Sequence, residues 1–181
     1  FGIAAERAAG KLILRVEDLD ATRCNPQFTT AAIEDLRWLG LSWTEGPDGE
    51  GDHGPYFQSQ RSDFYLQAWQ RLAQQKNIYP SPQSRRDLQT AAFAPHVSDE
   101  GESVFPKNYR PNEWVVPEHP GRVPWRFRVP DGKTIQFVDR NFGLVQRVAG
   151  TDFGDFVVWR RDNLAAYELA VVVDDYHMEI G

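Results

Sequence analysis

The first strong hydrophobic feature of the chain is the short, mostly apolar run KLILRV at residues 11–16. A continuous run of this length is typical of a strand that is covered on both faces, as in a parallel α/β sheet. The preceding residues 1–10 resemble the end of a helix that is closed by Gly10. The pattern therefore predicts a buried parallel strand near the start of the sequence.

Two later segments have apolar residues at helical spacing. The first begins at Asn25, which can cap the helix, followed by Pro26 in its first turn, and it ends at Gly40. The second covers roughly residues 62–76, and a loop rich in glycine and proline at residues 44–56 separates the two. This order of helix, strand, helix, loop and helix is typical of a doubly wound domain.

The pattern changes after residue 78. Between residues 79 and 124 prolines are frequent and apolar periodicity is weak, which indicates irregular structure. The segment PWRFRVPDGKTIQFVD, residues 124–139, alternates apolar and polar positions on both sides of a Pro-Asp-Gly turn. This alternation predicts a β-hairpin, and GDFVVWRRDN at residues 154–163 predicts one more strand leading into a turn.

These elements predict an α/β domain that is interrupted by an inserted subdomain. Residues 1–78 form the first part of the domain, residues 79–154 the β-rich and irregular insertion, and residues 155–181 the return into the domain. The segment AAYELAVVVDDYHM near the end is ambiguous on local grounds. Its valines favour a strand, whereas AAYELA favours a helix.

Composition narrows the class of protein. The 181 residues are 41% hydrophobic and 25% charged, which is ordinary for a folded protein and excludes general disorder. The net charge of −6 excludes a global attraction to nucleic acid, so any such contact needs a local basic surface. The single cysteine, Cys24, excludes an internal disulfide and a multi-thiolate zinc site. A single cysteine also suits a reducing cytoplasm, where we expect the protein, and no apolar stretch approaches the ~20 residues of a membrane span.

A group of carboxylates follows the predicted strand directly. Ligands of open parallel sheets bind beyond the carboxyl ends of the strands, where Glu17, Asp18 and Asp20 stand. A carboxylate there could hold an ammonium group, a ribose or a metal. In the structural alternative, which is the commoner case for charged clusters, the two aspartates cap turns while Glu17 pairs with Arg15 or Arg23.

The motifs LRVEDLDATR, WLGLSW, GPYFQSQR and GDFVVWRRDNLAAYELAVVVDD resemble the glutamate-specific class I aminoacyl-tRNA synthetases. The similarity covers nearly the whole chain except residues 85–123. It implies a Rossmann-like catalytic domain with an inserted β-containing subdomain, and it makes AYELAVVVDDYHM a helix. Val171 and the WRRD pattern resemble truncated paralogues of the family, which attach glutamate to queuosine of tRNA(Asp), more than ordinary members acting on tRNA(Glu).

The resemblance also implies roles for single residues. Glu17 matches the family glutamate that binds the substrate α-ammonium, and Tyr167 matches a tyrosine that lines the same pocket. Asp20 and Arg23 fall in the extended motif as possible contacts to tRNA or substrate. The expected ligands are L-glutamate, ATP with Mg²⁺, and tRNA(Asp) or alternatively tRNA(Glu), bound by a monomer. A non-catalytic RNA-binding relative that kept the fold is a third possibility.

The sequence departs from the family pattern in several places. The ATP-binding motifs of the family are expected before residue 1 and after residue 181, so the chain looks incomplete at both ends and its catalytic residues stay unassigned. Many members bind zinc through cysteines, and the matching positions here are Ser81, Gln83 or Ser84, and Tyr109. None of these replaces a thiolate, so the sequence predicts no zinc.

Other polar residues leave alternatives open. The aspartates Asp174 and Asp175 could bind a metal, although a capping and turn role is favoured. The four histidines lack metal spacing and are expected in loops or at the surface: His53, His96, His119 and His177. Six arginines on or beside the predicted insertion could form a phosphate-binding surface or pair with Asp139 and Asp155 across strands: Arg126, Arg128, Arg140, Arg147, Arg160 and Arg161.

Overall fold

The computed structural model describes residues 5, 7, 9–20, 22–83 and 104–181. The chain forms two compact units, one made of residues 1–66 with 170–181 and the other of residues 67–169. The domain borders predicted at residues 78/79 and 154/155 stay predictions, and Ser84, His96 and residues 85–103 of segment 85–123 lie outside the described residues.

Residues 11–16 do not form the regular strand that the apolar run predicts. They are extended and make two isolated parallel bridges, Ile13 to Glu45 and Val16 to Phe57. The N–H of Leu14 donates to the carbonyl of Glu45 at 2.9 Å, and that of Val16 donates to Tyr56 at 2.8 Å. The parallel direction is as expected, but the partner backbone belongs to the glycine- and proline-rich loop and follows the run only briefly.

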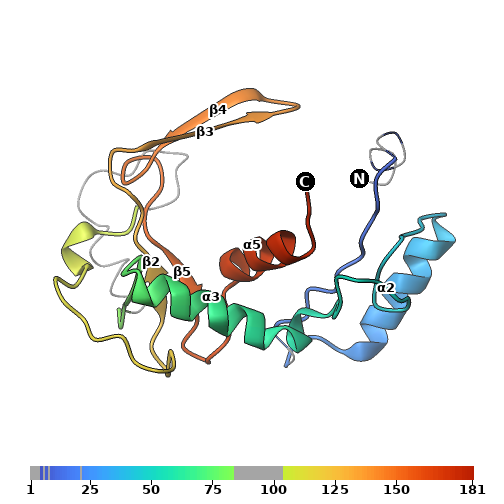
Figure 1. The fold of residues 1–181 in the computed structure, drawn as a ribbon, viewed down its shortest axis with the longest axis horizontal. Coiled ribbons are helices and arrows are strands. Elements are labelled where there is room, and N and C mark those ends of the chain that lie inside the picture. The colour runs from blue at the N-terminus through green and yellow to red at the C-terminus, as the bar shows by residue number, and fades with distance from the viewer. Residues whose placement is uncertain (1–4, 6, 8, 21, 84–103) are drawn as a thin grey trace. The chain divides into compact units, whose positions relative to one another are not determined.

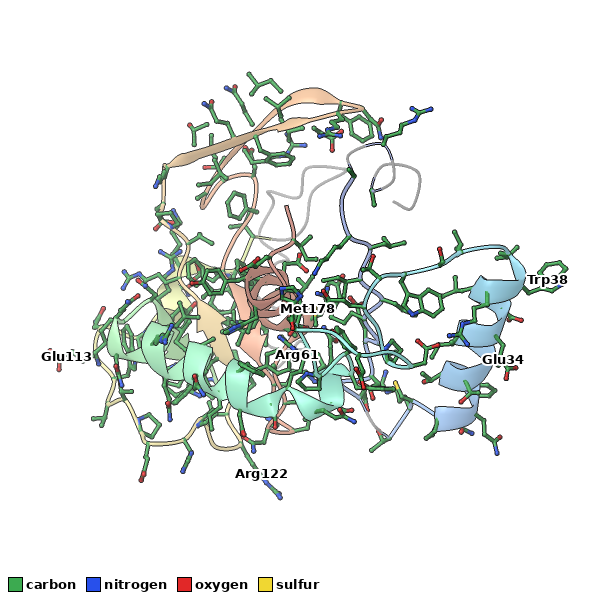
Figure 2. All side chains as sticks on the ribbon, turned by 45° about the vertical axis from the view of Figure 1, so that its right-hand side comes forward. Glu34, Trp38, Arg61, Glu113, Arg122 and Met178 are labelled. Carbon is green, nitrogen blue, oxygen red and sulfur yellow. The ribbon has the colours of Figure 1, made fainter. Side chains whose placement is uncertain are left out.

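Helix α2, Pro26–Trp38, begins where the sequence predicts. The side chain of Asn25 accepts a hydrogen bond from the N–H of Gln27 at 3.0 Å, which satisfies one of the free donors at the helix start. The helix ends before Gly40, whose φ of +78° suits glycine. None of its residues is buried, and Trp38 is 84% exposed and projects from the helix end in Figure 2.

Two further helices follow the predicted positions (Figure 1). Helix α3 spans Ser62–Gln74, and its apolar face includes the buried residues Tyr65, Trp69 and Ala73. Helix α5 spans Tyr167–His177, so the helical interpretation of this segment is confirmed despite its three consecutive valines. Short 3-10 turns occur at Gln58–Gln60 and Lys107–Tyr109. Within the described ranges, no helix has the length and apolar character that a membrane span requires.

The unit of residues 67–169 contains an antiparallel three-stranded sheet. Its strands are β1 (Ile78–Pro80), β2 (Trp125–Phe127) and β5 (Phe156–Trp159), in the order β1-β2-β5. The core of this unit is aromatic, because the ring of Trp69 meets that of Trp125 edge-on at 4.9 Å and lies 6.4 Å from that of Trp159. The strand predicted in residues 154–163 is confirmed.

The hairpin predicted around the Pro-Asp-Gly turn is wrong. Strand β3 (Thr134–Asp139) pairs with β4 (Gly143–Val148), whereas β2 pairs with β1 and β5. The hairpin turn lies after Asp139, whose carboxylate accepts hydrogen bonds from two backbone N–H groups of the turn, at 2.7 and 2.9 Å. The Pro-Asp-Gly turn instead separates the two sheets, so β3 and β4 form a ribbon of their own (Figure 1).

Candidate functional site

Glu17 lies at the end of the extended run in the unit of residues 1–66 and 170–181. Its side chain is 42% exposed, and one carboxylate oxygen lies 3.4 Å from the guanidinium of Arg15. This is one of the pairings that the structural alternative predicts. The remaining exposure leaves the carboxylate accessible to a ligand.

The other two carboxylates of the motif have local partners. Asp18 accepts hydrogen bonds from the N–H and the hydroxyl of Ser59, at 2.9 and 2.6 Å, and so fixes the 3-10 turn. Asp20 contacts the Thr22 hydroxyl at 2.6 Å and the guanidinium of Arg23 at 3.2 Å. The pair of Asp20 and Arg23 is therefore brought together, as a local turn that does not include Glu17.

Arg15 connects Glu17 to helix α5. Its Nη1 donates to Asp175 at 2.8 Å, and its Nε lies 3.6 Å from a carboxylate oxygen of Asp174. The side chain is only 14% exposed. Burial works against its charge, but the hydrogen bond to Asp175 and the charges of both aspartates prevail and raise the pKa of Arg15 above its ordinary value. Arg15 is thus a permanent cation within reach of three carboxylates.

The structure corrects the expectation for Asp174, which serves neither as a cap nor as a metal ligand. Its fully buried carboxylate accepts hydrogen bonds from Arg61 Nε at 2.6 Å, Gln58 Nε2 at 2.8 Å and the Tyr65 hydroxyl at 3.0 Å. Burial and the charge of Asp174 raise the pKa of Tyr65, which therefore stays a neutral donor. Arg61, which is labelled in Figure 2, lies near the part of helix α5 that carries Asp174.

The charges of this network, which we call the Arg15 cluster (Arg15, Glu17, Arg61, Asp174 and Asp175), do not balance. Two guanidinium groups face three carboxylates, so one negative charge is left uncompensated. The buried carboxylate of Asp174 lies beside both guanidinium groups, while the side chains of Glu17 and Asp175 are 42% and 43% exposed. A cation such as a primary ammonium group would complete the charge balance at this exposed end.

Tyr167, the other residue expected in the pocket, is the first residue of helix α5 and is 55% exposed. It belongs to the unit of residues 67–169, whereas Glu17 belongs to the other unit, so each is placed only within its own unit. Sequence reasoning did not assign Arg61 or Gln58 to the site. Their signal was the motif GPYFQSQR, which the resemblance used for recognition without giving its residues a role.

A second buried carboxylate in the same unit holds the loop of residues 44–56. Glu45 is 3% exposed and accepts hydrogen bonds from the Tyr56 hydroxyl at 2.7 Å, from His53 at 2.9 Å and from Lys11 at 3.1 Å. These hydrogen bonds, the one from Tyr56 first, lower the pKa of Glu45 to about 2. Glu45 is thus a structural anion beside the bridge to Ile13.

The positions where relatives are expected to bind zinc have different partners. Ser81 donates to Gln83 at 2.8 Å and accepts from the guanidinium of Arg126 at 3.2 Å, and that guanidinium also lies over the ring of Phe105 at 4.2 Å. A fixed cation next to Ser81 opposes a divalent metal there. Within the described ranges, no group of three or more side chains is arranged to bind a metal, and the absence of zinc stays a prediction.

The cross-strand pairing of arginines with Asp139 and Asp155 is wrong, because the carboxylates of these two aspartates contact other groups. Asp139 serves its own turn, and the buried Asp155 is held in a two-pronged contact by Arg110, with both nitrogen–oxygen distances at 2.7 Å. The hydrogen bonds to Asp155 and Asp131 raise the pKa of Arg110 despite its partial burial. Arg126 contacts only the backbone carbonyl of Asp155, at 3.0 Å.

Comparison with known proteins identifies the family of the chain. Residues 1–181 match the family described as tRNA synthetases class I (E and Q), catalytic domain, and the chain belongs to this family. It is 45% identical over 181 residues to the glutamyl-Q tRNA(Asp) synthetase of Symbiobacterium thermophilum, which covers 97% of this chain and 55% of the relative. The enzyme of the same name from Nitratidesulfovibrio vulgaris is 42% identical over 182 residues, with 98% and 56% covered.

Two proteins of lower sequence identity, a glutamate–tRNA ligase and a ligase of known structure, also match the chain. The glutamate–tRNA ligase of Symbiobacterium thermophilum is 38% identical over 184 residues, with 97% of this chain and 37% of the relative covered. A crystal structure of a glutamate tRNA ligase from Elizabethkingia meningosepticum matches with a TM-score of 0.77 at 22% identity, over 99% of this chain and 38% of that one. The fold is therefore the predicted α/β fold of class I synthetase catalytic domains. The chain spans about half the length of the two glutamyl-Q relatives.

Proposed function

We propose that the whole protein is a glutamate-specific ligase that activates L-glutamate with ATP and Mg²⁺ and transfers it to tRNA. The observation that carries this proposal is the uncompensated negative charge of the Arg15 cluster, exposed at Glu17, in a chain of the class I synthetase family. An amino-acid substrate brings the primary ammonium group that this charge can bind.

In this proposal, side chains of the 181 residues bind and orient the glutamate substrate. Glu17 receives the α-ammonium group, and Arg15 holds the Glu17 carboxylate while Asp174 and Asp175 hold Arg15. Tyr167 is assigned to substrate binding by the family resemblance. Fixing the amino acid aligns its carboxylate with the α-phosphorus of ATP, and such alignment is a large part of catalysis in reactions of this kind. No proton transfer is assigned to this segment.

The finer proposal is that the acceptor is queuosine in the anticodon of tRNA(Asp). It is supported by the names of the relatives at 45% and 42% identity, against 38% for a glutamate–tRNA ligase. Val171 and the sequence Trp159-Arg160-Arg161-Asp162 favour the same choice. The alternative is an ordinary ligase that charges the 3′ end of tRNA(Glu).

Aminoacylation of purified tRNA separates the two acceptors. The full-length protein is incubated with radiolabelled glutamate, ATP and either tRNA(Asp) or tRNA(Glu), each prepared with and without queuosine. We expect label on queuosine-containing tRNA(Asp) and on none of the other three. Charging of tRNA(Glu) alone would contradict the finer proposal and favour the ordinary ligase.

A further inference from the structure

Asp175 is a half-exposed carboxylate at a position where it does not stabilise its own helix. It lies in the last turn of helix α5, and its side chain is 43% exposed. The carbonyl groups at the end of a helix carry a partial negative charge, so a carboxylate in the last turn is electrostatically unfavourable. The charge of Asp175 is therefore stabilised by a group outside the helix, and that group is the guanidinium of Arg15.

The three carboxylates around Arg15 contact it at different distances. Asp175 accepts a hydrogen bond from Nη1 at 2.8 Å, which is the ordinary length of a charge-assisted contact. The oxygen of Glu17 lies 3.4 Å from Nη2, which is long for a hydrogen bond, and that of Asp174 lies 3.6 Å from Nε. Of the three, Asp175 makes the strongest contact with this guanidinium group.

Arg15 and Glu17 are nevertheless placed to form a closer pair. They are two residues apart at the end of the extended run, and alternate residues of an extended chain point to the same side. A guanidinium group and a carboxylate that face each other can form two parallel hydrogen bonds. Such a closed pair would neutralise Glu17 and weaken its attraction for an ammonium group. Because Nη1 donates to Asp175, only Nη2 contacts Glu17.

Burial limits the positions that the guanidinium group can take. The side chain of Arg15 is 14% exposed, and Nη1 also lies 3.8 Å from the sulfur of the buried Met178, which is labelled in Figure 2. Its Nε is buried and has no hydrogen-bond partner among the described residues. The two outer nitrogen atoms are thus shared between Asp175 and Glu17, and the loss of one carboxylate favours a closer contact with the other.

We propose that Asp175 is a positioning residue that keeps Glu17 available to the ammonium group of the substrate, by drawing Arg15 away from a closed pair with Glu17. The inference rests on the proposed function, in which Glu17 receives that ammonium group. Asp175 does not contact the substrate and acts through Arg15. Its charge compensates the guanidinium group, so Glu17 keeps its own negative charge for the ligand.

Calorimetric titration of the full-length protein with L-glutamate tests the inference. The wild type is compared with Asp175→Asn, with the conservative variant Asp175→Glu, and with the control Asp63→Asn, which removes an exposed carboxylate of helix α3 outside the Arg15 cluster. Thermal unfolding establishes that each variant is folded. We expect Asp175→Asn to bind glutamate roughly threefold to tenfold more weakly, between the effect of an exposed ion pair and that of a charge-assisted hydrogen bond. Asp175→Glu and Asp63→Asn should bind like the wild type.

Two further measurements separate this role from a purely structural one. The first uses a sulfamoyl analogue of glutamyl-adenylate and its counterpart without the α-amino group. Asp175→Asn should weaken binding of the first analogue alone, because Glu17 acts on the ammonium group. The second measurement repeats the Asp175→Asn comparison in an Arg15→Gln background, where the change in glutamate affinity should disappear because Asp175 acts through Arg15.

A folded Asp175→Asn protein that binds glutamate like the wild type would overturn the inference, and so would equal weakening of both analogues. A loss of affinity that persists unchanged in the Arg15→Gln background would make Asp175 a direct ligand of the substrate and end its positioning role. If Arg15→Gln does not fold, the two analogues and Asp175→Glu decide alone. A wild type that binds no glutamate contradicts the proposed function itself, whereas the other outcomes contradict only the inference.

Discussion

Asp174 and Asp175 are neighbours on helix α5 with the same chemistry and very different surroundings. Asp174 is fully buried against the equally buried Arg61, whereas Asp175 is 43% exposed and pairs with Arg15. Removing one partner of a buried ion pair leaves a charge that neither water nor a counter-ion stabilises. The two positions therefore give a matched test of what the Arg15 cluster contributes to stability.

We expect Asp174→Asn to lower the free energy of unfolding by about 3–5 kcal/mol, because the buried guanidinium of Arg61 loses the carboxylate with which it pairs. Asp175→Asn is the control and is expected to cost about 0–1 kcal/mol, because Asp175 is 43% exposed and Arg15 keeps Asp174 as a second partner. Urea-induced unfolding of the wild type and the two variants measures both values. Equal losses for the two would mean that the buried network does not carry the difference.

Glu45 gives a pH-dependent prediction. Its pKa in the folded protein is about 2, against an ordinary value of 4.5. The unfolded chain therefore takes up this proton first as the pH falls, so the stabilisation from Glu45 is complete above pH 4.5 and disappears toward pH 2. We expect Glu45→Gln to be less stable than the wild type at pH 7, and this difference to shrink through that window.

The measurement is urea-induced unfolding of wild type and Glu45→Gln at a series of pH values. Subtracting the two curves removes the contributions of all other groups that the variant leaves unchanged. A difference that is constant from pH 7 to pH 2.5 would show that the hydrogen bonds from Tyr56 and His53 do not stabilise the charged form of Glu45.

At the scale of elements, helix α2 depends on local interactions, because none of its residues is buried. Its N-cap, Asn25, satisfies the N–H of Gln27. Replacing such a cap by alanine costs about 0.5–2 kcal/mol, and we expect Asn25→Ala to speed amide hydrogen exchange throughout the helix. Asn25→Asp keeps a capping oxygen and should retain the protection. Unchanged exchange in Asn25→Ala would mean that other contacts hold the helix.

The helices could be predicted from the sequence because their signals are local. Asn25 with Pro26 marks the start of α2, Gly40 marks its end, and the apolar spacing around Trp69 marks the buried face of α3. Helix α5 was ambiguous locally, since its valines fit a strand as well. The family resemblance decided it correctly.

The strand pairing could not be predicted, because it depends on residues far apart in the sequence. The turn at Pro130 has the composition of a hairpin turn. Strand β2 nevertheless pairs with β1 and β5, and its Trp125 packs against Trp69. In the same way, the run at residues 11–16 is apolar enough for a strand, but among the described residues its two bridges are to loop backbone. Asp174 was misjudged for the same reason, since its partner Arg61 lies 113 residues away.

For the whole molecule, we predict that the full-length protein binds no zinc through residues 81–109. The hydroxyl of Ser81 and the amide of Gln83 are poor zinc ligands, and the guanidinium of Arg126 lies 3.2 Å from Ser81. Elemental analysis of purified protein measures the metal content. One equivalent of zinc that survives mild chelation would contradict the prediction.

The central claim is that Glu17 binds the ammonium group of glutamate. Glu17→Gln keeps the size of the side chain and removes its charge, so it tests electrostatics rather than packing. Glu34→Gln is the matched control, because Glu34 is an exposed carboxylate on helix α2 outside the Arg15 cluster (Figure 2). Thermal unfolding of both variants establishes that each is folded before binding is compared.

Calorimetric titration of the full-length protein with L-glutamate is the most direct measurement. We expect Glu17→Gln to bind glutamate roughly tenfold to a hundredfold more weakly than the wild type, as the loss of a charge-assisted contact of about 1.5–3 kcal/mol requires. Glu34→Gln should bind like the wild type. A Glu17→Gln protein that is folded and binds glutamate as tightly as the wild type would show that Glu17 only pairs with Arg15 and receives no substrate.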